Sequence, residues 1–214
     1  MVNKDFIDLY FEEKINLYQN IDRYLILKLY DLVKDVYLKS GYIFFAANGG
    51  PSGIVQNAVT DLRFHPFVSE SKQESTNLKK LKVIDFSESS GALTGISNDL
   101  GFENVFSEQL KNYLDDKTNN NSLTIMFSGS GNSKNIVNLC KLSNNNGIKT
   151  FSITGRGGGE LKKISKYCLN IEGSSNFPGQ TGKNDNNFHI EDIQNSIIHI
   201  ITGLLKNFVN PNSN

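Results

Sequence analysis

The sequence predicts an α/β fold in which helices cover both faces of a parallel five-stranded sheet, a three-layer α/β/α arrangement. Short apolar runs of strand length alternate with segments of helical periodicity, as in proteins whose parallel strands are joined by crossover helices. Three of the apolar runs end in polar turns that contain glycine, the usual composition of a strand-to-helix connection. The 214 residues favour a single domain, 1–214, with a sizeable core.

The first segment, residues 5–40, has a helical pattern. Its apolar residues recur at spacings of three and four, which predicts one long amphipathic helix or two. Ser40 and Gly41 form the stop signal at its end. The apolar positions extend beyond one narrow stripe, so we expect this N-terminal helical segment, 1–40, to pack on the domain or against neighbouring subunits.

The remaining elements alternate along the chain. The apolar runs expected as strands cover residues 42–47, 82–86, 123–127, 150–154 and 167–171. The segments expected as helices cover residues 51–64, 92–100, 102–114, 133–144, a short stretch after 159, and 189–209. Pro51 suits the first turn of the helix that it begins. The asparagine-rich patches are expected as loops, and they cover residues 119–121, 144–146 and 184–187.

Composition and charge exclude several classes of protein. The chain carries 22 Lys+Arg against 22 Asp+Glu and no basic run longer than two residues, which argues against a nucleic-acid partner. The N-terminal residues lack the apolar stretch of a signal peptide, and no apolar span of about 18 residues suggests a membrane helix. Two cysteines, Cys140 and Cys168, are too few for a disulfide framework. We therefore expect a cytoplasmic protein with no membrane partner and two buried thiols.

The turn after the third expected strand is rich in hydroxyl groups and bare backbone. It contains Ser128, Ser130 and Ser133 with two glycines, and Ser133 is placed as the N-cap of the next helix. The N–H groups and the partial positive charge of a helix N-terminus favour an anion, so phosphate is the natural ligand. A capped turn that binds nothing has the same composition. The dinucleotide pattern Gly-x-Gly-x-x-Gly and the Walker A pattern are both absent from the sequence.

Two other strand ends share this chemistry. The sequence Asn-Gly-Gly-Pro-Ser follows the first strand at residues 48–52, and a turn with four glycines follows the fourth at residues 154–159. Because ligands in parallel α/β sheets bind at the carboxyl ends of the strands, we expect the three turns to form one site.

Four segments together resemble a known family. They are the strand end at 47–51, the Leu-Thr-x-x-x-Asn-Asp-x-Gly segment at 93–102, the Ser-Gly-Ser-Gly-Asn-Ser loop at 128–133 and the Thr-Gly-x-Gly-Gly turn at 154–158. In order and spacing they resemble the sugar isomerase (SIS) domain, and within it the phosphoheptose isomerases, also called sedoheptulose 7-phosphate isomerases. The likeness covers nearly the whole chain.

The resemblance implies an isomerase that interconverts ketose and aldose phosphates through an enediol, here sedoheptulose 7-phosphate and a heptose 7-phosphate in heptose biosynthesis. It also implies a homotetramer with sites shared between subunits, and a zinc ion held between two helices. The substrate-binding residues that it carries over are Asn48, Gly49, Gly50, Ser52, Asp99, Ser128, Ser130 and Ser133.

The chain departs from the family at the zinc ligands. The family's histidine falls on Asn57, and its glutamate, four residues later, falls on Asp61. The two positions share a helix face, but asparagine is a poor zinc ligand and aspartate is one methylene shorter than glutamate. Pro51 and Ile54 also replace a serine and an acidic residue of the family.

The last helix allows two alignments with the family. In one, Gln194 is the family's glutamine ligand and Thr202 stands in place of its histidine. In the other, His199 is the catalytic histidine and Glu191 replaces the glutamine. The apolar residues around His199 favour the second alignment, in which Glu191 and His199, just over two helical turns apart, face one cleft. His189, near the start of the helix, is a further candidate ligand.

We therefore expect Asp61 and His199 to move protons, and Asp61, Glu191 and His199 to bind zinc or another divalent ion. Acid–base catalysis without a metal is the open alternative. His199 as an ordinary core histidine and Asp61 as a solvated helix carboxylate are the alternatives without function. For the whole chain, a non-catalytic phosphosugar-binding regulator and an isomerase-like enzyme with another substrate stay open.

Overall fold

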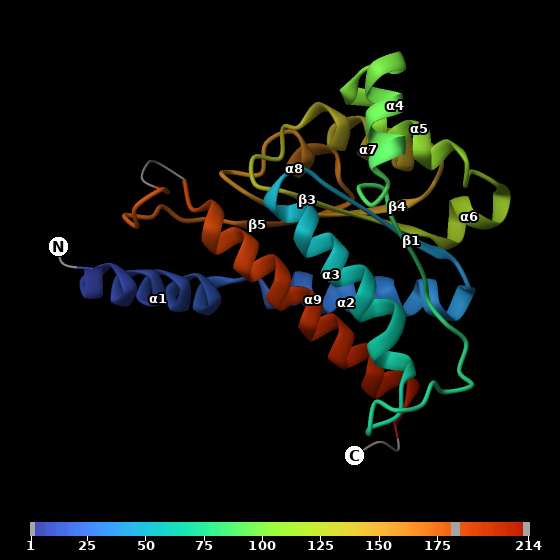
Figure 1. Ribbon diagram of the computed structural model, residues 1–214, viewed down its shortest axis with the longest axis horizontal. Helices are drawn as coiled ribbons and strands as arrows, with labels where there is room; N and C mark the ends of the chain where they lie inside the picture. The colour runs from blue at the N-terminus through green and yellow to red at the C-terminus, as the bar shows by residue number, and fades with distance from the viewer. Residues whose placement is uncertain (1–2, 181–184, 212–214) are drawn as a thin grey trace.

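The structure is a computed structural model that describes residues 3–180 and 185–211. Its centre is a parallel sheet of five strands in the order β2-β1-β3-β4-β5, flanked by helices on both faces (Figure 1). The strands are β1 (Tyr42–Ala47), β2 (Lys82–Asp85), β3 (Leu123–Ser128), β4 (Lys149–Gly155) and β5 (Tyr167–Ile171). The predicted α/β class and parallel five-stranded sheet are confirmed, because each expected strand is present to within one residue.

Two separate cores lie on the two faces of the sheet, which follows from the alternation of side chains along each strand. In β1, Ile43 and Phe45 point into one core, whereas Phe44 and Ala46 point into the other. Because all of these side chains are buried, β1 is apolar on both faces, as expected for the interior of a parallel sheet.

Three long helices cover the first face of the sheet and smaller helices cover the second. The first face carries α2 (Arg23–Lys39), α3 (Gly50–Phe64) and α9 (Asn187–Val209), of which α3 and α9 lie side by side in Figure 1. The other helices are α1 (Asn3–Asn20), α4 (Ser90–Leu100), α5 (Val105–Lys111), α6 (Asp116–Asn121), α7 (Lys134–Asn145) and α8 (Leu161–Ile164), with 3-10 turns at His65–Phe67 and Phe102–Asn104. Among the described residues, no helix combines the length and apolar character needed to cross a membrane.

Two details of the sequence prediction were wrong. The asparagine-rich patch 119–121 belongs to helix α6, because the Asp115 side chain accepts the Thr118 N–H at 2.6 Å and caps the helix start. The single helix expected over 102–114 is broken instead into a 3-10 turn and the shorter α5.

The predicted N-terminal segment forms two helices, since Asp22 caps a new start by accepting the Leu25 N–H at 3.1 Å.

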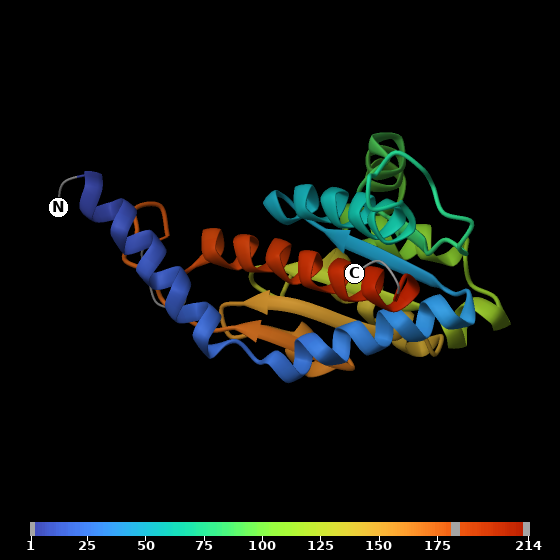
Figure 2. The same cartoon turned by 90° about the horizontal axis from the view of Figure 1, so that it is seen from below.

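Helix α1 is attached to the rest of the chain mainly through polar contacts. Figure 2 shows it extending beyond the sheet and its covering helices. Tyr10 and Lys14 both bond the Asp192 carboxylate of α9, at 2.6 and 2.7 Å. On the same side of α1, the Glu13 carboxylate lies 3.0 Å from the Nε2 atom of the fully buried His189. Ion pairs and hydrogen bonds therefore help to place α1, together with Leu17, which is buried in the core.

Both carboxylates of this junction have pKa values below their ordinary range. For Glu13, burial raises the pKa, but the Asn176 N–H, the Ser175 hydroxyl and His189 together outweigh it. For Asp192, burial is likewise outweighed by the bonds from Lys14 and Tyr10. A carboxyl whose folded-state pKa is lowered stabilises the fold above its unfolded pKa, and this contribution is lost as the pH falls through the folded value.

We expect acid to release α1 before the sheet unfolds. Amide hydrogen exchange measured from pH 7 down to about pH 3 should show protection of α1 falling below the ordinary carboxylate pKa range while β1 and β3 stay protected. Glu13→Gln should weaken α1 protection already at pH 7, whereas Glu12→Gln, at an exposed position of the same helix, should not. Equal loss of protection in α1 and in the strands would contradict the prediction.

Candidate active site

The turns after β1 and β3 meet in one cavity at the carboxyl end of the sheet. The cavity has a volume of about 240 Å³. Its lining consists of Asn48, Gly49, Gly50, Pro51, Phe127, Ser128, Gly129, Ser130, Ser133, Arg156, Asn187 and Glu191. Six of the eight expected substrate-binding residues are therefore together. Ser52 instead donates its hydroxyl proton to the Gly49 carbonyl at 2.6 Å, and Asp99 lies exposed on α4, outside this lining.

The serine loop holds its own shape and leaves one hydroxyl free of internal bonds. The Ser128 hydroxyl accepts the Gly131 N–H at 3.0 Å, and the Ser130 hydroxyl accepts the Asn132 N–H at 3.2 Å. Ser133 occupies the N-cap position of α7, as predicted, but its side chain makes no capping bond. The Ser133 hydroxyl and the N–H groups of Lys134 and Asn135 at the start of α7 are thus available to an anion in the cavity, whereas the Ile136 N–H bonds the Asn135 side chain.

Three lining residues were missed by the sequence analysis. Arg156, between two glycines of the third turn, brings a positive charge to the cavity and bonds Asp185 at 2.8 Å. Its φ of 49° is in the left-handed region, a strain that is common at functional sites. Asn187 and Phe127 also line the cavity. Of these three residues, Arg156 could have been recognised from the sequence, because an arginine in a glycine-rich turn suits an anion site.

An amide pair fixes the end of β1 against α7. Asn48 and Asn135 exchange two side-chain hydrogen bonds, each 2.9 Å long. Asn135 is buried and its oxygen also accepts the Ile136 N–H. Asn48 therefore positions the glycine turn that follows it.

Glu191 lies where this cavity opens into a groove between α3 and α9. Its carboxylate accepts a 2.7 Å bond from the Asn187 amide, and both oxygens lie against Gly50, where an added Cβ would come within 2.7 Å of them. Burial raises the pKa of Glu191. The groove beyond it has a volume of about 490 Å³ and is lined by Gly50, Gly53, Ile54, Asn57, Glu191, Asp192, Asn195 and His199.

The two residues expected to move protons lie together at the far end of this groove, where His199 lines it and Asp61 lines the adjoining hollow. The His199 Nε2 atom lies 3.4 Å from Oδ2 of Asp61, and the imidazole is 56% exposed while the Asp61 side chain is 10% exposed. His65, which the sequence analysis left without a role, lies 3.4 Å from the other oxygen of Asp61. Asp61 is therefore a nearly buried carboxylate between two exposed imidazoles.

The alternative alignment of the last helix places its ligand away from the groove. Gln194 is fully buried, and its amide donates to the Ile153 carbonyl of β4 at 3.1 Å. His189 is also fully buried and pairs with Glu13. Glu191 and His199, the residues of the preferred alignment, line the groove together with Asp192 and Asn195 of the same helix.

The expected metal-ligand trio is not assembled. Within residues 3–180 and 185–211, no group of three or more His, Cys, Asp or Glu side chains is placed to hold a metal ion. Asp61 and His199 are together, but Glu191 is bonded to Asn187 at the other end of the groove. The donor set present does not fit zinc.

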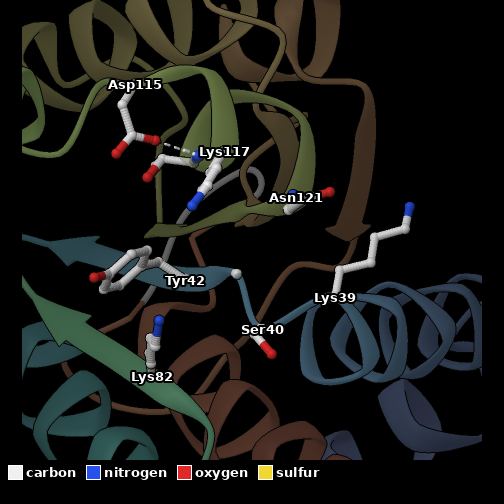
Figure 3. A pocket seen from close by; sticks show the side chains of 9 residues that line it. Lys39, Ser40, Tyr42, Lys82, Asp115, Lys117 and Asn121 are labelled. Atoms are coloured by element: carbon white, nitrogen blue, oxygen red, sulfur yellow. Dashed lines mark hydrogen bonds between the residues drawn. The ribbon is translucent and has the colours of Figure 1, made fainter.

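A larger cavity, of about 370 Å³, lies at the opposite edge of the sheet (Figure 3). It surrounds Tyr42 and Lys82, the first residues of β1 and β2, and the Lys82 ammonium lies 4.9 Å from the centre of the Tyr42 ring. Asp115 and Lys117 of the α6 region complete one wall. Because parallel α/β sheets bind ligands at the carboxyl ends of their strands, this cavity is not the candidate active site.

Comparison with known proteins agrees with this geometry. No family model matches the chain. A phosphoheptose isomerase of Helicobacter pylori (strain Shi470) is 30% identical over 173 residues, which cover 80% of this chain and 78% of that protein. The chain belongs to the phosphoheptose isomerase family. The phosphoheptose isomerase of Akkermansia muciniphila is 33% identical over 135 residues, and the match spans 65% of its length, just under two thirds.

Solved structures of the family share the fold. The phosphoheptose isomerase GmhA from Neisseria gonorrhoeae superposes with a TM-score of 0.76 at 20% identity, over 95% of this chain and 98% of that one. A phosphoheptose isomerase from Francisella tularensis gives 0.75 at 19% identity, over 96% and 99%. The resemblance seen in the four sequence segments and the SIS-type α/β fold are both confirmed.

Proposed function

We propose that this chain is a phosphosugar aldose–ketose isomerase that converts sedoheptulose 7-phosphate to a heptose 7-phosphate through an enediol. One observation carries the proposal: the groove along α9 runs within one chain from the serine-lined cavity to His199, whose imidazole lies 3.4 Å from the Asp61 carboxylate. Gly50 and Glu191 line both the cavity and the groove. The family membership supports the reaction class.

The substrate would lie along α9 with its phosphate in the cavity. The serine hydroxyls, the N-terminus of α7 and Arg156 supply donors and positive charge for the phosphate. From Glu191 to His199 the helix advances by ~12 Å, a span that suits an extended sugar phosphate. Glu191, with its raised pKa, is placed to hydrogen-bond a sugar hydroxyl midway.

Asp61 and His199 would carry out the proton transfers. One of them takes the proton from the carbon beside the carbonyl, and the other gives a proton to the carbonyl oxygen, which forms the enediol. Protonation of the former carbonyl carbon and loss of the proton on the neighbouring hydroxyl complete the isomerisation. No proton or electron is consumed overall, so the pair returns to its starting state.

An NMR time course with sedoheptulose 7-phosphate tests this function. New aldose-phosphate signals are expected with the purified protein, and the Asp61→Asn, His199→Ala double variant should produce none. Binding without turnover would favour the non-catalytic regulator. Turnover of a different ketose phosphate alone would favour an altered substrate. Turnover that survives the double variant would overturn the assigned proton carriers.

Ser133→Ala should weaken substrate binding without weakening the fold. Its hydroxyl makes no capping bond, so its removal costs α7 nothing, but the phosphate loses one hydrogen bond to a charged group. We expect KM to rise about 10-fold or more with an unchanged melting temperature. Ser128→Ala is the matched comparison, because it also removes the bond to the Gly131 N–H and should lower both affinity and stability. An equal loss of stability in the two variants would contradict the prediction.

We further propose a cytoplasmic homotetramer that shares its sites between subunits. Two apolar faces on long helices support assembly: Ile7, Phe11 and Ile15 of α1, and Ile200, Leu204 and Phe208 of α9 are all exposed at spacings of four. The free thiols Cys140 and Cys168 suit a reducing compartment. Light scattering of the purified protein would measure the mass of the assembly. Each subunit of the proposed tetramer would consist of the single domain proposed for residues 1–214.

A further inference from the structure

The amide of Asn57 lies at the centre of the α3–α9 groove, among groups that would otherwise attract a cation. Its nitrogen is 3.0 Å from Oδ1 of Asn195, 3.3 Å from Oδ2 of Asp61 and 3.4 Å from Nε2 of His199. We propose that this amide replaces the zinc ion of the family, so that the groove is closed by hydrogen bonds and holds no resident metal. The consequence for catalysis rests on the proposed isomerase function, whereas the consequence for metal binding does not.

The chemistry of the amide supports this assignment. An NH₂ group offers two protons and no lone pair, so it satisfies acceptors and cannot ligate a metal. The reversed orientation of Asn57 would place the amide oxygen beside the Asp61 carboxylate and the Asn195 oxygen, where acceptors repel one another. The contacts therefore select the orientation in which the two protons of the nitrogen face the two oxygen acceptors, Oδ1 of Asn195 and Oδ2 of Asp61.

The lone pairs that zinc would need are already used. Oδ2 of Asp61 faces Asn57 and His199, and Oδ1 of the same carboxylate faces His65. Asp61 is nearly buried, so its partners are not replaced by bulk water. Glu191, the third expected ligand, is bonded to Asn187 instead.

Asp61 and His199 are the metal-competent side chains beside Asn57, whereas His65 approaches the other oxygen of Asp61. Catalytic zinc sites use three protein ligands and a water molecule, and among the described residues no three His, Cys, Asp or Glu side chains are placed to hold a metal ion. Polarisation of the substrate oxygens then depends on donors already in the groove, the Asn57 amide and the His199 imidazole.

Rebuilding the ligand set tests the inference. The Asn57→His, Asp61→Glu double variant restores both residue types of the family on the same face of α3. The Gln56→His, Asp61→Glu variant is the control, because position 56 is exposed and does not line the groove. Zinc binding to each apo protein is measured by equilibrium dialysis against zinc sulfate, and circular dichroism verifies the fold.

The rebuilt variant should bind zinc about 100-fold more tightly than the wild type, because changes around metal ligands alter the metal affinity by up to about 100-fold. The control should bind as weakly as the wild type. Wild-type binding of one zinc per chain with an affinity within tenfold of the rebuilt variant would overturn the inference. Equal weak binding by all three proteins would overturn the assignment of position 57 as the deciding residue.

Chelation gives the second readout. If wild-type turnover exists, it should persist unchanged after dialysis against a chelator, and its loss would overturn the inference. If the wild type shows no turnover at all, the proposed function fails while the dialysis result still decides the metal question.

Discussion

His199→Ala is expected to lower kcat by about 10²- to 10⁴-fold, the usual contribution of a positioned acid or base. The imidazole is 56% exposed and contacts the Asp61 carboxylate and the Asn57 amide, so its removal leaves no cavity in the core. Asp61 keeps His65 and Asn57 as partners, which prevents an isolated buried charge. The melting temperature should therefore stay close to that of the wild type while the NMR rate falls.

His65→Ala is the matched control for this prediction. His65 is also an exposed histidine 3.4 Å from an oxygen of Asp61, but on the side away from Asn57 and Glu191. We expect it to reduce kcat far less than His199→Ala does. If both variants lose activity equally, the two imidazoles share the proton transfer, and the assignment to His199 alone is wrong.

Gly131→Ala is expected to disrupt the phosphate cavity and destabilise the protein. Gly131 has a φ of 67°, and an added Cβ would lie 2.0 Å from the Gly158 carbonyl oxygen. The backbone conformation costs about 1–2 kcal/mol for a residue with a side chain, and the forced separation of the two turns adds about 1–3 kcal/mol. Together these predict a loss of about 2–5 kcal/mol in the free energy of unfolding, with a large rise in KM.

Gly157→Ala separates the cost of the backbone conformation from the cost of forcing the two turns apart. Gly157 has a φ of 82°, but no atom lies within 4 Å of its would-be Cβ. Only the conformational cost of about 1–2 kcal/mol is expected, with KM little changed. Urea unfolding and phosphosugar kinetics of both variants measure these effects. Equal destabilisation of the two would show that the close approach of the turns does not matter.

The strands were predictable because their signal is local. Each expected strand is a short apolar run between glycine or polar turns, and burial on both faces of a parallel sheet requires that composition. Helix α6 escaped prediction because Asn119 and its neighbours have poor intrinsic helix propensity, which the Asp115 cap offsets. The break at residues 102–104 was also missed. Gly101, with a φ of 88°, turns the chain just before the 3-10 turn that precedes α5.

The serine-lined cavity was largely predictable and the groove was not. The serines and glycines of the cavity come in contiguous turns at adjacent strand ends, so topology alone brings them together. Arg156 was missed because its place in the cavity depends on a run of left-handed residues, from Arg156 to Gly159, whose path is not evident from composition. The metal trio of Asp61, Glu191 and His199 was expected from the family resemblance together with helix spacing, which specifies the face of a helix but not what the neighbouring helix places opposite it.

By itself the sequence determined the sheet, its parallel connections, the anion-binding turns and the family, because these depend on periodicity and on residues close along the chain. The tertiary structure alone decided which polar groups meet between α3 and α9. Asn57, Asn195 and His199 are separated by up to 142 positions along the chain, and only the packing of the two helices brings the amide nitrogen within hydrogen-bonding distance of its acceptors. Hydrogen bonds and metal bonds depend on differences of a few tenths of an ångström, and such distances are set by packing rather than by spacing in the sequence.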